Sequence, residues 1–174
     1  MQLRRDDEAN RAQRALRRVV ASRPGAWVSK RTLHRLDLLA HRLAPGRPAP
    51  SQVLAAVPVG LLTTTGARSG RQRTVPLLVV PLEDGWGVIA SHYGSERPPA
   101  WYFNLRAHPL ASLEVDGVTH RVWAEQVHGP ERERVRRAAL AYYRGYTAYE
   151  KRAGGRDLGF FVLHPQDAEH PEHD

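Results

Sequence analysis

The chain has 174 residues, of which 41% are apolar and 25% charged, and this composition fits one soluble globular domain rather than two. It contains no cysteine, which excludes a disulfide framework, a thiolate nucleophile, an iron–sulfur cluster and cysteine-ligated zinc. The net charge is +8, and residues 1–50 hold 12 of the 26 lysines and arginines but 4 of the 18 acidic residues. The basic excess therefore belongs mainly to the N-terminal part of the chain.

The first 50 residues are predicted to be a basic helical extension. Apolar residues recur at helical spacing in residues 7–22 and again in residues 26–43, and Arg23-Pro24-Gly25 separates the two segments. The proline-rich residues 45–50 form a linker that does not continue a helix. The N-terminus lacks the apolar core of a secretory signal, and no apolar run approaches the roughly 20 residues that span a bilayer. We expect a cytoplasmic protein.

The rest of the chain is predicted to be mainly β with helices, an α+β domain over residues 51–165 followed by a flexible acidic tail at 166–174. Strands are predicted at residues 59–65, 73–81, 86–91, 110–116, 118–128 and 159–164, with helices at 99–107 and 130–150. Glu83-Asp84-Gly85 and Asp116-Gly117 have the composition of hairpin turns, and Pro76 places its strand at an edge or beside a bulge. About six short, mostly antiparallel strands predict a small barrel with helices outside it.

Residues 66–71 connect the first two predicted strands and have the composition of an anion site. Two glycines, Gly66 and Gly70, punctuate a polar tip that carries Arg68 and Arg71, with Arg73 just beyond. Backbone N–H groups held by a turn beside guanidinium groups bind phosphates or carboxylates. The alternative is a hairpin tip that is merely solvated.

Aromatic residues are also grouped. Tyr143, Tyr146 and Tyr149 step three residues at a time along the predicted C-terminal helix and would share one side of it. Such tyrosines form a wall with a polar edge that suits a flat conjugated ligand, and the alternative is ordinary packing of the helix on the barrel. The nine histidines are scattered, so no metal site is expected, and no nucleophile or Rossmann motif is present. We therefore expect any chemistry to be carried by a cofactor.

Four segments in order resemble the deazaflavin-dependent nitroreductase/quinone reductase family, whose members are actinobacterial oxidoreductases that use reduced coenzyme F420. The segments are TTTGARSGRQRTVPL, ASHYG, PAWYFNLRAHP and AYYRGYTAYEKRAGGR, and the resemblance covers about residues 55–165. It implies a split β-barrel that binds the deazaflavin in a groove. It also implies hydride transfer to a quinone, a nitroaromatic compound or an activated enone, with a tyrosine hydroxyl or water supplying the proton.

The resemblance further implies roles for individual residues. The positions that match the family's cofactor-binding residues are Arg68, Ser69, Gly70, Arg71, Arg73, Pro76, Ala90, Ser91, His92, Trp101, Asn104 and Tyr146. Tyr143, Tyr146 and Tyr149 match its substrate-binding tyrosines. For catalysis it implies that Tyr146 or Tyr143 orients the acceptor and that Ser91 offers hydrogen-bond donors to the ring of the coenzyme. His92 and Arg144 depart from the family, which usually has a lysine and a proline at these positions.

Three other interpretations remain open at this point. Related split barrels bind FMN, and a member of the family that binds a cofactor without catalysis would carry the same motifs. The basic residues 7–43 also suit a peripheral contact with the inner face of a membrane. Nucleic-acid binding through the same residues is not favoured, because the core is close to neutral and carries no motif that reads DNA or RNA. The sequence does not predict the oligomeric state.

Overall fold

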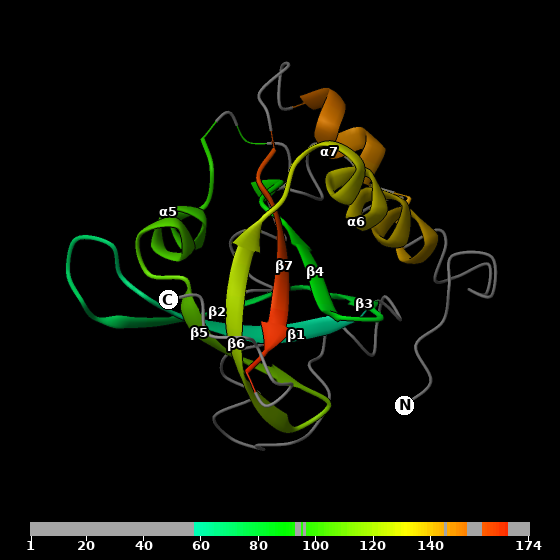
Figure 1. The fold of residues 1–174 in the computed structure, drawn as a ribbon. Coiled ribbons are helices and arrows are strands. Elements are labelled where there is room, and N and C mark those ends of the chain that lie inside the picture. The colour runs from blue at the N-terminus through cyan, green and yellow to red at the C-terminus, as the bar shows by residue number, and fades with distance from the viewer. Residues whose placement is uncertain (1–57, 93–94, 96, 145, 153–157, 167–174) are drawn as a thin grey trace.

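A computed structural model describes residues 58–92, 95, 97–144, 146–152 and 158–166. The helices predicted at 7–22 and 26–43, the linker and the acidic tail from residue 167 onward lie outside these residues, so the domain boundaries and the membrane contact stay predictions. The described part contains seven strands and three helices (Figure 1). They are β1 (Val59–Thr65), β2 (Gln72–Leu78), β3 (Val80–Leu82), β4 (Gly85–Ile89), α5 (Ala100–Ala107), β5 (Leu110–Val115), β6 (Val118–Gln126), α6 (Gly129–Tyr142), α7 (Tyr146–Arg152) and β7 (Phe160–Pro165).

All seven strands belong to one antiparallel sheet with the order β2-β1-β5-β6-β7-β4-β3. β2 and β3 follow each other in the chain but lie at the two ends of this order, so the sheet curls into a half-barrel. The mainly β fold predicted from the sequence is confirmed. The single strand predicted at 73–81 is wrong, because Val79 turns the chain from one edge of the sheet to the other. Its backbone N–H donates to the carbonyl of Pro58 at 3.0 Å, and the residues after it pair with β4.

The predicted turn residues and Pro76 occupy the expected places. Asp116 and Gly117, between β5 and β6, both have positive φ (50° and 82°), as a two-residue type I′ turn requires. Gly85 follows the turn between β3 and β4 with φ 143°, and an added Cβ there would lie 2.2 Å from the carbonyl oxygen of Leu163. Pro76 lies in β2, which is an edge strand, as its missing N–H predicts.

The helices differ from the prediction at one point. The helix predicted at 99–107 is α5, and its N-cap residue is Pro99. The single helix predicted at 130–150 is wrong, because α6 ends at Tyr142 and α7 begins at Tyr146. Tyr143 has an extended backbone (φ −150°, ψ 94°) that does not continue a helix, and the sequence places Gly145, a poor helix former, two residues later.

Two buried clusters lie on opposite faces of the sheet. α5 covers one of them, and α6 and α7 cover the other (Figure 1). In β7, Phe160 and Val162 pack in the cluster under α6 and α7, whereas Phe161 and Leu163 pack in the cluster beside α5. A strand covered on both faces reads as a continuous apolar run, which explains the sequence FFVL.

Candidate functional site

The connection between β1 and β2, residues 66–71 and here called the hairpin tip, is a closed turn. The Gly66 N–H donates to the carbonyl of Arg71 at 2.9 Å, and the Gly70 N–H donates to the carbonyl of Gly66 at 2.8 Å. Gly70 has φ 64°, and a Cβ at Gly66 would lie 2.6 Å from Ser69 Oγ. Both predicted glycines are therefore needed at the positions they occupy.

The hairpin tip projects beside α5 and carries positive charge that no acidic residue in the described part of the chain neutralises (Figure 1). Arg68, Arg71 and Arg73 are exposed, and none of them forms an ion pair with another residue that the structure describes. The backbone N–H groups of Arg68 and Ser69 also make no hydrogen bond within the described ranges. Three guanidinium groups and two backbone donors are thus left for a ligand.

Asn104 of α5 joins the helix to the hairpin tip. Its Oδ1 accepts a hydrogen bond from the backbone N–H of Ala67 at 3.0 Å. Its Nδ2 donates to Oγ1 of Thr64 at 2.9 Å, and Thr64 is completely buried. Sequence reasoning missed Thr64. The strand alternation that places Leu62 in the core also places Thr64 inward, and a polar residue at an inward position indicates a buried hydrogen-bond partner.

Three further residues predicted to contact a cofactor follow the end of β4. Ala90 is fully buried, and its N–H donates to the carbonyl of Gly159 at 2.8 Å. Ser91 is 7% exposed. His92 has φ 46°, which is uncommon for a residue other than glycine, and its Nδ1 lies 2.9 Å from the carbonyl oxygen of Arg97.

Trp101, also predicted to contact a cofactor, lies in the core. Its side chain is 7% exposed and packs edge-to-face on Phe161 with ring centroids 6.0 Å apart. Trp101 and Ala90 belong to the same buried cluster, so the structure brings these two predicted residues together. Pro76 lies away from the tip at the outer strand, paired with Leu61.

Tyr143, Tyr146 and Tyr149 form one buried cluster although the helix is broken between them. Their ring centroids are 5.9 to 6.0 Å apart, and the hydroxyls of Tyr143 and Tyr149 lie 3.0 Å apart. Each ring is between 5% and 7% exposed. The cluster packs with Ile89 and Phe160, so in this structure the tyrosines pack as ordinary core residues. The hydroxyls of Tyr143 and Tyr149 are buried within the cluster. The role of these tyrosines in binding an acceptor stays a prediction.

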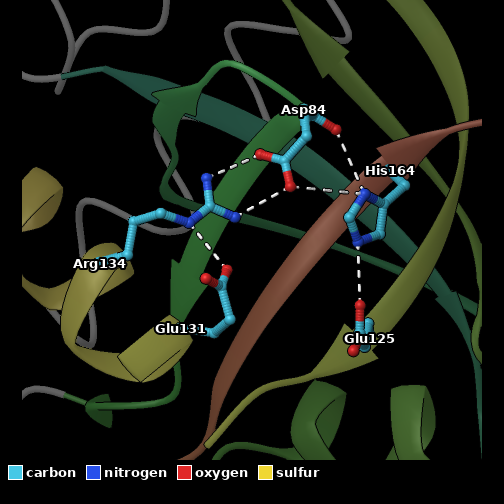
Figure 2. A network of polar contacts seen from close by, with 5 residues as sticks. All are labelled: Asp84, Glu125, Glu131, Arg134 and His164. Carbon is cyan, nitrogen blue, oxygen red and sulfur yellow. Dashed lines mark hydrogen bonds and ion pairs between the residues drawn. The ribbon is translucent and has the colours of Figure 1, made fainter. Parts of the chain in front are cut away.

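A separate polar network fixes α6 to the sheet (Figure 2). Arg134 of α6 donates two hydrogen bonds to the carboxylate of Asp84, at 2.8 and 2.9 Å, and a third to Glu131 at 2.8 Å. His164 of β7 contacts the backbone carbonyl of Asp84 and the carboxylate of Glu125, both at 3.2 Å. The hydrogen bonds from Arg134 hold the pKa of the Asp84 carboxyl below its ordinary value, and the same pairing raises the pKa of Arg134. The network could not be predicted from sequence spacing, since its members come from four separate elements.

In the described part of the chain, no group of three or more His, Asp or Glu side chains is arranged to hold a metal ion. None of the helices that the structure describes is both long enough and apolar enough to cross a membrane.

Comparison with known proteins identifies the family. The profile described as F420H(2)-dependent quinone reductase matches residues 44–165. The F420H(2)-dependent quinone reductase Rv1261c of Mycobacterium tuberculosis is 34% identical over 99 residues, which are 56% of this chain and 60% of that protein. The chain thus aligns with less than two thirds of the length of this relative.

Two solved structures are similar in fold as well as in sequence. The structure of an F420-H2 dependent reductase, FDR-A, is 34% identical with a TM-score of 0.57, over 61% of this chain and 93% of that one. A structure described as a domain-swapped dimer is 29% identical with a TM-score of 0.59, over 80% of this chain and 98% of that one. The profile match alone spans more than half of the sequence. The chain therefore belongs to the F420H(2)-dependent quinone reductase family.

Proposed function

We propose that this protein is an oxidoreductase that uses reduced coenzyme F420 to reduce a quinone. The observation that carries the proposal is the hairpin tip, whose three arginines have no acid partner in the part of the chain that the structure describes. Family membership and the names of the relatives support the choice of coenzyme and acceptor. Nitroaromatic compounds and activated enones are proposed as further acceptors on the same chemistry.

The hairpin tip fits the anionic part of this coenzyme. Coenzyme F420 carries a phosphodiester and a tail of glutamates, and such groups bind guanidinium side chains and backbone N–H groups. Arg68, Arg71 and Arg73 would hold these anionic groups, together with the backbone N–H groups of Arg68 and Ser69. When bound, the coenzyme supplies the hydride, so the protein needs no nucleophile of its own.

The end of β4 is proposed to hold the ring of the coenzyme. Ala90 is pinned by its hydrogen bond to Gly159, and Ser91 follows it at the limit of the buried core. The Ser91 hydroxyl and nearby backbone groups would offer donors to the ring. Trp101, which is buried against Phe161, would support this wall from behind and expose little of its own surface.

The tyrosine cluster is proposed to orient the acceptor. Ile89 packs with these tyrosines while its neighbour Ala90 packs with Trp101, so the end of β4 borders both clusters. Tyr143 and Tyr146 would hold a flat acceptor by ring contact, and a tyrosine hydroxyl or water would supply the proton. Tyr146 would then contact both the coenzyme and the acceptor.

A charge-removal variant tests the proposal. Replacing Arg68, Arg71 and Arg73 together by glutamine should weaken binding of coenzyme F420 at least about 100-fold, since a hydrogen bond to a charged group contributes roughly 1.5 to 3 kcal/mol. Arg121→Gln, at an exposed position of β6, is the matched control and should bind like the wild type. Binding is followed by tryptophan fluorescence, and reduction of menadione by absorbance.

The outcomes separate the proposal from its rivals. Binding of FMN in place of coenzyme F420 would keep the fold and overturn the choice of coenzyme. Coenzyme binding without reduction of any quinone would identify a binding protein instead of a reductase. If the triple variant binds as tightly as Arg121→Gln, the hairpin tip is not the anion site.

A further inference from the structure

Asn104 uses both ends of its amide within the protein. The acceptor Oδ1 is occupied by the Ala67 N–H, and Nδ2 donates to the buried hydroxyl of Thr64. The side chain is 6% exposed, and its neighbours on α5, Trp101 and Leu105, are buried in the core. The Asn104 amide therefore lies on a part of α5 that the buried side chains of Trp101 and Leu105 anchor in the core.

We propose that Asn104 is a positioning residue that holds the hairpin tip in its ligand-binding conformation. The inference deepens the proposed function and rests on it. The resemblance to the family implied that Asn104 contacts the cofactor, whereas the structure assigns its amide to the backbone of the tip. In this role Asn104 acts through Ala67 on the donors that follow it in the chain.

The position of Ala67 explains why one hydrogen bond has this effect. Ala67 lies directly before Arg68 and Ser69, whose backbone N–H groups make no hydrogen bond in the described ranges. Two backbone hydrogen bonds close the tip on itself, from Gly66 to Arg71 and from Gly70 to Gly66, and the Arg71 N–H also donates to Ser69 Oγ at 3.4 Å. The bond from Ala67 instead ties the tip to α5. A loop that is ordered before binding loses less conformational entropy when its ligand arrives.

The chemistry of the amide suits this role. The partner at the tip is a donor and needs an acceptor, while Thr64 Oγ1 accepts from Nδ2. An aspartate would still accept from Ala67, because a carboxylate is an acceptor, but it would add negative charge beside an anion site. A leucine has a similar size and offers no hydrogen bond. The two substitutions therefore separate the hydrogen bond from the charge.

The experiment measures binding of two probes by tryptophan fluorescence. One probe is coenzyme F420, and the other is its deazaflavin ring with the ribityl chain, which lacks the phosphate and the glutamates. Asn104→Leu should weaken binding of F420 about 10-fold and binding of the short probe less than twofold. Phe103→Leu, at a position of α5 that is 48% exposed, should change neither. Amide hydrogen exchange of Ala67 without ligand should be faster in Asn104→Leu.

Asn104→Asp provides the rescue. At 0.5 M salt, where charge repulsion is largely screened, it should bind F420 more tightly than Asn104→Leu and keep slow exchange at Ala67. Equal losses for the two probes, or equal affinities of the two variants at high salt, would overturn the positioning role. If the wild type binds F420 and Asn104→Leu binds it with the same affinity, this inference alone is overturned. Absence of F420 binding by the wild type would overturn the proposed function and this inference with it.

Discussion

Two groups of arginines in this molecule are used in opposite ways. At the hairpin tip, Arg68, Arg71 and Arg73 are exposed and have no acid partner among the residues that the structure describes. On α6, Arg134 makes three hydrogen bonds to two carboxylates. The first group leaves its charge available for a ligand, and the second uses its charge to join elements of the fold. An arginine therefore indicates a ligand-binding site only where no acidic side chain of the protein pairs with it.

The two regions also differ in what their geometry depends on. The network around Arg134 links the turn between β3 and β4, strand β7 and helix α6 (Figure 2). Among the hydrogen bonds of the described residues, only the one between Ala67 and Asn104 links the hairpin tip to α5. We expect changes near Asp84 to lower stability and changes at the tip to lower affinity.

The largest effect on stability is expected at Gly85. Gly85→Ala would place a Cβ 2.2 Å from the carbonyl oxygen of Leu163 at φ 143°, so the turn or β7 must move. We expect a loss of about 3 kcal/mol in the free energy of unfolding, measured by urea denaturation, with coenzyme affinity of the folded protein unchanged. Gly70→Ala is the matched control, because Gly70 has φ 64° with no atom within 4 Å of the added Cβ. It should cost less stability, about 1 to 2 kcal/mol, and, unlike Gly85→Ala, should lower the affinity for the coenzyme.

A contrary result at these glycines would remove the distinction between the regions. If Gly85→Ala weakens coenzyme binding as much as Gly70→Ala does, stability and binding are not divided between the network and the tip.

A smaller effect is expected at the tyrosine cluster, which lies on the side of the sheet that the network fixes. Tyr143→Phe removes the hydroxyl 3.0 Å from that of Tyr149 and should cost about 1 kcal/mol of stability. If the cluster orients the acceptor, kcat for menadione should also fall by at least about 10-fold, with the affinity for coenzyme F420 unchanged. Tyr142→Phe is the control, because Tyr142 packs against the same core cluster but is only partly buried. An unchanged kcat in Tyr143→Phe would exclude its hydroxyl from the reaction.

The smallest effect is expected at Arg134, because its partners are partly exposed. Arg134→Gln should lower stability by about 0.5 to 1 kcal/mol at pH 7. Arg134 holds the pKa of Asp84 below its ordinary value of 3.8, so this contribution is present above that pH and is lost as the pH falls through the lowered pKa. The stability difference between wild type and variant should therefore shrink below about pH 4. A difference that stays constant from pH 7 to pH 2 would show that the ion pair does not carry it.

Much of the fold followed from the sequence because strand alternation and turn residues are local signals. The strand predicted at 59–65 is β1 with the same bounds, and Asp116-Gly117 forms the expected turn. The corner at Val79 was not predictable, because residues 77–80 around it (LLVV) read as one continuous run of strand-forming residues. Its position depends on the hydrogen bond to Pro58 and on pairing with β4, which are contacts of the folded chain.

The site was predicted in part for the same reason. The glycines and arginines of the hairpin tip are contiguous, so their pattern indicates an anion site. The bond between Asn104 and Ala67 joins residues 37 positions apart, and only the packing of α5 beside β1 brings them together. The grouping of Tyr143 and Tyr149 was expected from a helix, yet the structure achieves it across a break between α6 and α7.

The two ends of the strand order have one property in common. β2 contains Pro76 and β3 contains Pro81, and each is an edge strand of the described sheet. A proline has no backbone N–H, so each edge offers one donor fewer to an approaching strand. Edge-to-edge pairing between copies of the chain is therefore disfavoured at both ends of the sheet, which protects an open half-barrel against aggregation.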